Sequence, residues 1–134
     1  MRLTVAFGTH DGKKLTDEHY GQSTYFDIYE ISEDEIRFVE RRNNPQYEED
    51  ESKLHGDPGK ARTVMSVHGG VQVAVGKRFG PNITRMLKKI ACVVVRGVDT
   101  IDEAAQLVQK HLAEVAKAWE AGEGRKHVTL KAEN

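Results

Sequence analysis

The sequence predicts a three-layer α/β fold, in which a five-stranded mixed sheet carries helices on both faces. Strand-like and helix-like segments follow one another in the order β-β-β-α-β-α-β-α. The second strand is expected to be antiparallel to the first, and a hairpin returns the third strand parallel to the first. The last two strands arrive through helical crossovers, which favour parallel addition to the sheet.

Three strands are expected in the first third of the chain. Residues 3–7 form a short apolar run that ends at Gly8. Residues 24–31 alternate aromatic and β-branched side chains with polar ones, and residues 35–41 alternate again after a turn at 32–34. This pattern is typical of a hairpin with one buried face.

Helices and strands alternate in the middle of the chain. A helix is expected to begin at Asp57-Pro58, an N-cap followed by Pro at the first helical position, and to end at Gly69-Gly70. Residues 71–75 then form a strand. A second helix opens at Gly80-Pro81 and leads into the continuously apolar strand 92–95, which suggests burial on both faces.

The last helix is the clearest element. Thr100 to Glu103 fits a capping box, and Gly122 suits a C-cap. A continuous apolar stripe lies between them: Ile101, Ala104, Ala105, Val108, Leu112, Val115 and Trp119. A single domain is therefore expected over residues 1–122. Residues 123–134 follow as a polar C-terminal tail, unless residues 128–130 add a weak strand.

Composition excludes several classes of protein. The chain has 134 residues, of which 38% are hydrophobic, and its single Cys rules out a disulfide framework and a CxxC metal site. With 20 basic and 21 acidic residues the net charge is -1, so no nucleic-acid partner is expected. No apolar run reaches about 18 residues, so no membrane span is expected, and the cytoplasm is the expected compartment.

Ligand-binding residues are expected at one edge of the sheet. Four connections leave the carboxyl ends of parallel strands there, where open α/β folds bind ligands: residues 8–22, 43–57, 76–81 and 96–100. These connections carry three histidines and three cations: His10, His19, His55, Lys77, Arg78 and Arg96. A helix beginning near Pro81 also favours an anion. The edge therefore predicts a site for a negatively charged ligand that contains metal.

Several of these side chains have simpler interpretations. A loop histidine is more often a surface or hydrogen-bonding residue than a ligand. Lys77 and Arg78 can simply be solvated. Cys92 opens an apolar strand and is expected to be buried. His111 borders the apolar stripe and is expected to pack against the core, and His68 suits the dipole at a helix end.

Short motifs, in a matching order, resemble those of one family over residues 1–121. Glu18-His19-Tyr20-Gly21 is similar to the His-Phe-Gly motif of the dinitrogenase iron–molybdenum cofactor-binding and biosynthesis proteins. Asp11-Gly12-Lys13, His55-Gly56 and the segment 73–82 resemble the same family. The resemblance implies a ribonuclease H-like fold. It also implies a role in nitrogenase cofactor biosynthesis, and so in nitrogen fixation, as a carrier of iron–molybdenum cofactor or a related metal–sulfur cluster.

Two positions depart from the family pattern. Tyr20 replaces the usual Phe, and the loop at His55-Gly56 lacks the Cys that several relatives carry. Without a thiolate, a soft metal loses its best ligand. Binding would then depend on imidazoles and charge, and the cluster would exchange more readily.

The leading hypothesis is a non-enzymatic, cofactor-binding carrier of an anionic cluster. His19 and His55 are the expected metal ligands, Lys77 and Arg78 are expected to neutralise the cluster's charge, and His10 is a weaker candidate. Expected partners are the cluster itself and cofactor-assembly or target apo-proteins.

Two other function classes were weighed against the carrier. A two-metal nuclease needs clustered carboxylates, but the strand 3–7 has no acid and the strand 71–75 leads into Lys77-Arg78. No nuclease activity is therefore expected. A metal-free protein–protein adaptor on the same fold stays open. Its contact surface would be the acidic run 48–51, within a loop, 46–54, that is expected to be mobile.

Overall fold

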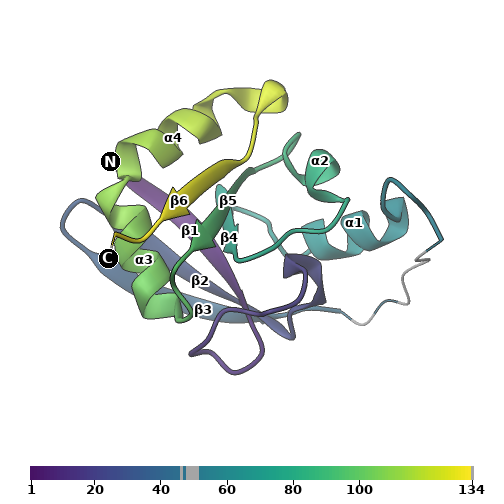
Figure 1. Cartoon of the computed structure of the whole chain (residues 1–134), viewed down its shortest axis with the longest axis horizontal. Coiled ribbons are helices and arrows are strands. Elements are labelled where there is room, and N and C mark those ends of the chain that lie inside the picture. Colours follow the sequence, from purple (N-terminus) through teal and green to yellow (C-terminus); the bar gives the residue numbers. More distant parts are fainter. Residues whose placement is uncertain (46, 48–51, 134) are drawn as a thin grey trace.

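In the computed structural model, which describes residues 1–45, 47 and 52–133, one mixed sheet organises the chain. Six strands of the described residues lie in the order β3-β2-β1-β4-β5-β6 (Figure 1). Their bounds are β1 Arg2–Thr9, β2 Tyr25–Ser32, β3 Ile36–Asn43, β4 Val73–Gly76, β5 Ala91–Arg96 and β6 Val128–Lys131. Strand β2 is antiparallel to β1 and β3, whereas β1, β4, β5 and β6 are parallel to their neighbours in turn.

The expectation of five strands is wrong, because β6 adds a sixth. This strand pairs in parallel with β5, with Val94 opposite Thr129, and Leu130 is only 2% exposed in the core. Strand β6 is a short edge strand with one face toward the core, so only the side chains on that face need to be apolar. Residues 128–131 of the expected polar tail therefore belong to the sheet.

Helices cover both faces of the sheet and complete three layers (Figure 1). Helices α3 (Ile101–Lys110) and α4 (Leu112–Glu120) pack on one face, where odd-numbered strand residues such as Phe7, Val75 and Val93 are buried. Helices α1 (Pro58–Met65) and α2 (Ile83–Met86) lie on the other face, over Ala6, Ala74 and the 3-10 turn η1 (Tyr20–Gln22). A second 3-10 turn, η2 (Gly122–Gly124), follows α4.

All three expected helices are shorter than predicted, and α1 ends at Met65 rather than at Gly69-Gly70. The last helix, expected to be continuous, breaks at His111, where the backbone has φ -110° and ψ 29°. Thr100 and Glu103 still cap α3 reciprocally, as the capping box predicts. Helix α2 is a single turn of four residues. The expected helix N-terminus near Pro81 therefore offers little dipole to an anion, because the dipole grows from many aligned peptide units.

Burial of Cys92 is confirmed. Its side chain is 1% exposed, and desolvation raises the pKa of the thiol to about 12. The buried thiol packs as a small apolar group of the core. In the described ranges, no helix combines the length and apolar character needed to span a membrane.

Candidate functional site

The loops that follow β1, β4 and β5 meet at one edge of the sheet. The main-chain N–H of Tyr20 donates to the carbonyl of Arg78 at 2.9 Å. The side chain of Lys77 reaches Asp17 in the first loop and Asp99 in the third. These contacts join segments that are far apart in the sequence. The structure therefore places His10, His19, Lys77 and Arg78 at one edge.

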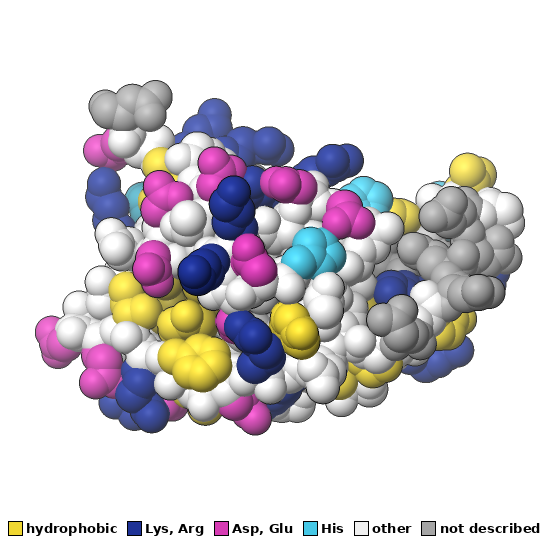
Figure 2. Space-filling view, turned by 90° about the horizontal axis from the view of Figure 1, so that it is seen from below, with side chains coloured by type: hydrophobic (Ala, Val, Ile, Leu, Met, Phe, Trp, Pro, Cys, Tyr) yellow, Lys and Arg dark blue, Asp and Glu magenta, His cyan; other side chains and the backbone are white. Residues whose placement is uncertain are grey.

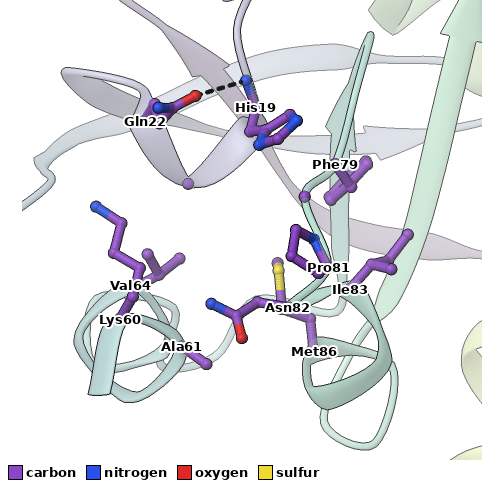
Figure 3. A pocket seen from close by; sticks show the side chains of 12 residues that line it. His19, Gln22, Lys60, Ala61, Val64, Phe79, Pro81, Asn82, Ile83 and Met86 are labelled. Atoms are coloured by element: carbon purple, nitrogen blue, oxygen red, sulfur yellow. Dashed lines mark hydrogen bonds between the residues drawn. The ribbon is translucent and has the colours of Figure 1, made fainter. Parts of the chain in front are cut away.

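A pocket opens at this edge between η1, α1 and the segment 79–86 (Figure 3). Its empty volume, including the mouth, is about 410 Å³. The lining is largely apolar, with a few polar groups: His19, Gly21, Gln22, Lys60, Ala61, Val64, Phe79, Gly80, Pro81, Asn82, Ile83 and Met86. Among the described residues that line it there is no Asp or Glu. A mostly apolar hollow with a few convergent polar groups is the usual form of a small-ligand site.

His19 stands at this pocket because η1 fixes its backbone. The main-chain N–H of His19 donates to Gln22 Oε1 at 3.0 Å (Figure 3). The N–H of Gln22 in turn donates to the carbonyl of His19 at 2.8 Å. The imidazole packs directly on Gly80, where an added Cβ would lie 2.8 Å from Nδ1. Among the described residues no full hydrogen bond reaches a ring nitrogen of His19, although the capping geometry of η1 turns the Gln22 N–H toward the imidazole. The half-buried ring is therefore available to a ligand.

Lys60 is a pocket-lining cation that the sequence did not single out. It is the third residue of α1 and is only 9% exposed, and its side chain runs from α1 toward η1 along the pocket (Figure 3). Its ammonium forms no hydrogen bond or ion pair among the described residues. The available signal was its position beside Ala61 and one turn before Val64, which places it on the flank of the buried stripe.

His10 lies in a separate hollow. Its Nδ1 is 2.7 Å from the Thr24 hydroxyl, and its Nε2 is 2.8 Å from Glu18 Oε1. Asp11 and Lys14 line the same hollow. Both ring nitrogens of His10 are therefore engaged by the protein itself, in contrast to those of His19.

Lys77 is paired rather than free. Its ammonium lies 2.7 Å from Asp17 Oδ1 and 2.5 Å from Asp99 Oδ1. Hydrogen bonds to these carboxylates raise the pKa of Lys77, and the Lys77 bond lowers the pKa of Asp17. On the face seen from below in Figure 2, acidic, basic and histidine side chains are interspersed. Arg78 is exposed and lines a third hollow with Lys77 and the segment 95–99.

His55 is exposed and does not line the pocket. Its carbonyl accepts a hydrogen bond from the guanidinium of Arg85, and its ring has no hydrogen bond in the described part of the chain. Of the predicted set, His19, His10 and the pair Lys77 and Arg78 line three different hollows. In residues 1–45, 47 and 52–133, no group of three or more His, Cys, Asp or Glu side chains is arranged to hold a metal ion.

Tyr20 and His68 form a buried pair behind the pocket. The Tyr20 hydroxyl lies 2.7 Å from His68 Nε2, and His68 Nδ1 lies 2.8 Å from the carbonyl of Val64. Since a carbonyl only accepts, Nδ1 carries the proton and Nε2 accepts from Tyr20. Desolvation lowers the pKa of His68 to about 4, so this residue is a neutral core group rather than a partner of the helix dipole.

The Tyr20 ring is held between two other aromatic rings. It stacks on Phe26 at 4.9 Å and on Phe79 at 5.0 Å between ring centroids. Tyr20 follows His19 directly, so this packing also positions the imidazole at the pocket. The Tyr20 hydroxyl, which a Phe at this position would lack, makes the hydrogen bond to His68.

The sequence model of one family, described as dinitrogenase iron-molybdenum cofactor, matches residues 1–111. The chain belongs to this family. The match confirms the resemblance stated from the motifs, and it includes η1, α1, α2 and all the residues that line the pocket. Membership in the dinitrogenase iron-molybdenum cofactor family associates the chain with a cofactor of that type.

A solved structure supports the fold of this family member. The crystal structure of a candidate dinitrogenase from Methanocaldococcus jannaschii superposes with a TM-score of 0.56 and is 16% identical in sequence. The similarity covers 83% of this chain and 91% of the archaeal one. At this identity the similarity concerns the fold alone. No curated protein matches the chain.

Proposed function

We propose that this protein binds and carries an anionic iron–molybdenum-type or related metal–sulfur cluster during cofactor assembly, without catalysing a reaction. The observation that carries the proposal is the His19 imidazole, which has no full hydrogen bond in the described residues and stands at the mouth of a pocket. Family membership and the position of the pocket at the carboxyl edge of the sheet support it. The three-layer mixed sheet also supports a ribonuclease H-like assignment.

A cluster held by few protein ligands is released readily, as a carrier requires. A neutral imidazole can donate its ring nitrogen to a metal, and a protonated one cannot. With His19 as the anchor and exposed His55 as a second ligand, the cluster would stay exchangeable with its partners, the assembly or target apo-proteins. The 410 Å³ includes space open to solvent, so the enclosed part of the pocket is smaller and most of a cluster would lie across the mouth.

The cations that attract the cluster differ in one respect from those expected from the sequence. Lys77 is already neutralised by Asp17 and Asp99, so it adds little positive potential for an anion. Arg78 is exposed on the same edge, and Lys60 lines the pocket without a counter-ion among the described residues. The proposal therefore assigns the attraction of an anionic cluster to Arg78 and Lys60 more than to Lys77.

Anaerobic titration of isolated iron–molybdenum cofactor into the apo-protein tests this function. His19→Ala should lower the affinity at about pH 7.5 by about tenfold or more, which is the loss of one good ligand. His127→Ala is the matched control, because His127 is exposed and precedes β6 at the opposite, amino end of the parallel strands. Equal affinity in wild type and His19→Ala would contradict ligation by His19.

A metal-free adaptor is the second candidate. The edge strand β3 exposes Phe38 and Val39, which are 50% and 42% exposed, and its outer backbone edge has no strand partner in the described residues. Such an edge can pair with a strand of another protein. The acidic run 48–51, expected to be the adaptor's contact surface and part of the loop 46–54, lies outside the described residues. No binding of cofactor by wild type would favour the adaptor.

A further inference from the structure

Lys60 is a largely buried cation without an ionic partner among the described residues. It is about nine-tenths buried, at 9% exposure, yet its ammonium has no hydrogen-bonding or ionic partner in the described part of the chain. The stem of Lys60 is buried, whereas its ammonium is not among the fully buried polar atoms that lack a partner in the described residues, so a ligand in the pocket can reach it. The nearest acid on its helix is Asp57, whose carboxylate accepts from the Gly59 N–H at 2.8 Å and lies 3.8 Å from Lys53 Nζ. The protein therefore commits that carboxylate elsewhere.

The surroundings of Lys60 restrict what could pair with it. Ala61, Val64 and Met86 are buried apolar residues that line the same pocket. Gln22 Oε1 is occupied by the main chain of His19, which leaves the amide NH₂ of Gln22 as a hydrogen-bond donor. The pocket thus combines one ammonium and neutral donors with an apolar wall. A complementary ligand has one anionic group that accepts hydrogen bonds and a short apolar body.

We propose that this pocket binds the carboxylate of a small organic acid, with the Lys60 ammonium as its counter-ion. The two carboxylate oxygens accept hydrogen bonds from Lys60 and from a neighbouring donor, and the stem of the acid packs on Val64 and Met86. Charge-assisted bonds of this kind are shorter and stronger than neutral ones, especially where water is excluded. The inference concerns the apo-protein and does not depend on cluster carriage.

Titration of the apo-protein with isobutyrate, followed by two-dimensional amide NMR, tests this inference. Isobutyrate has a carboxylate on a short branched stem, and isobutyramide is its neutral counterpart. Saturable binding in the millimolar range is expected for so small a ligand. The largest shift changes should fall on Lys60, Ala61 and Val64. No binding of isobutyrate to folded wild type, or equal binding of isobutyramide, would overturn the proposal.

Charge removal at Lys60 separates this site from a general surface effect. Lys60→Met keeps the stem and removes the charge, and it should weaken isobutyrate binding by about tenfold or more. Lys117→Met is the matched control, because Lys117 is exposed on α4 over the opposite face of the sheet and should leave binding unchanged. Lys60→Gln replaces Lys60→Met if that variant does not fold. Undiminished binding in the folded Lys60 variant would overturn the assignment.

Inorganic phosphate distinguishes the class of anion. It carries the charge and the acceptor oxygens but no apolar stem, so it should bind more weakly than isobutyrate. Tighter binding of phosphate at the same amides would contradict the carboxylate assignment. Because no cluster is present in these titrations, their outcome is independent of the cofactor titration described above.

Discussion

Tyr20→Phe removes one hydroxyl from the core behind the pocket and should destabilise the protein. Tyr20 is 1% exposed and His68 is 3% exposed, so water does not replace the lost donor. The variant leaves His68 Nε2 as a buried acceptor without a partner, which costs about 1–3 kcal/mol. With a denaturant dependence of about 1–3 kcal/mol per M, a loss of about 2 kcal/mol lowers the urea midpoint by about 1 M.

Urea unfolding followed by far-UV circular dichroism at about pH 7.5 measures this change. Tyr29→Phe is the matched control, because Tyr29 is half-buried against Phe7 and its hydroxyl has no hydrogen bond in the described ranges. It should change the free energy of unfolding by less than about 0.5 kcal/mol. Tyr20→Phe together with His68→Leu should cost less than the sum of the two single changes, since both polar partners are then absent. A Tyr20→Phe variant as stable as wild type would refute the assigned hydrogen bond.

Three further changes have defined outcomes. Burial lowers the pKa of His68 from 6.5 to about 4 in the folded protein. As pH falls, His68 is therefore protonated in the unfolded chain before it is protonated in the folded protein. Stability should fall by about 3 kcal/mol as pH drops from about 6.5 to about 4, and urea unfolding across that range checks it. Gly80→Ala should displace the His19 ring and weaken cofactor binding in the titration, whereas Gly124→Ala, with open space around it, should not. Leu130→Ala should lower the free energy of unfolding, measured with urea, by about 2–4 kcal/mol, because it removes a side chain that β6 buries in the core.

Local patterns predicted most of the fold. The apolar run of β1, the alternation in β2 and β3, and the capping box of α3 are all visible in short windows of sequence. Strand β6 was underestimated because an edge strand buries few side chains, and here Leu130 is its one buried residue. The break at His111 interrupts an apolar stripe that continues on both sides of it, so periodicity alone did not indicate it.

The site was predicted as an edge rather than as a pocket. Strand direction alone brings His19 and Lys77 to one side of the sheet, since β1 and β4 are parallel. Pairing within that edge depends on contacts between distant loops, such as that of Lys77 with Asp17. The burial of Lys60 likewise results from the packing of α1 beside η1, which no short window of sequence specifies.

Cofactor titration at two pH values tests cluster carriage by His19 most directly. Wild type should bind isolated iron–molybdenum cofactor more weakly at about pH 5.5 than at about pH 7.5, because only a neutral imidazole coordinates metal. His19→Ala should bind weakly at both pH values and lose most of that difference, while His127→Ala should behave as wild type. The same affinity and the same pH dependence in wild type and His19→Ala would contradict the role of His19 as the ligand.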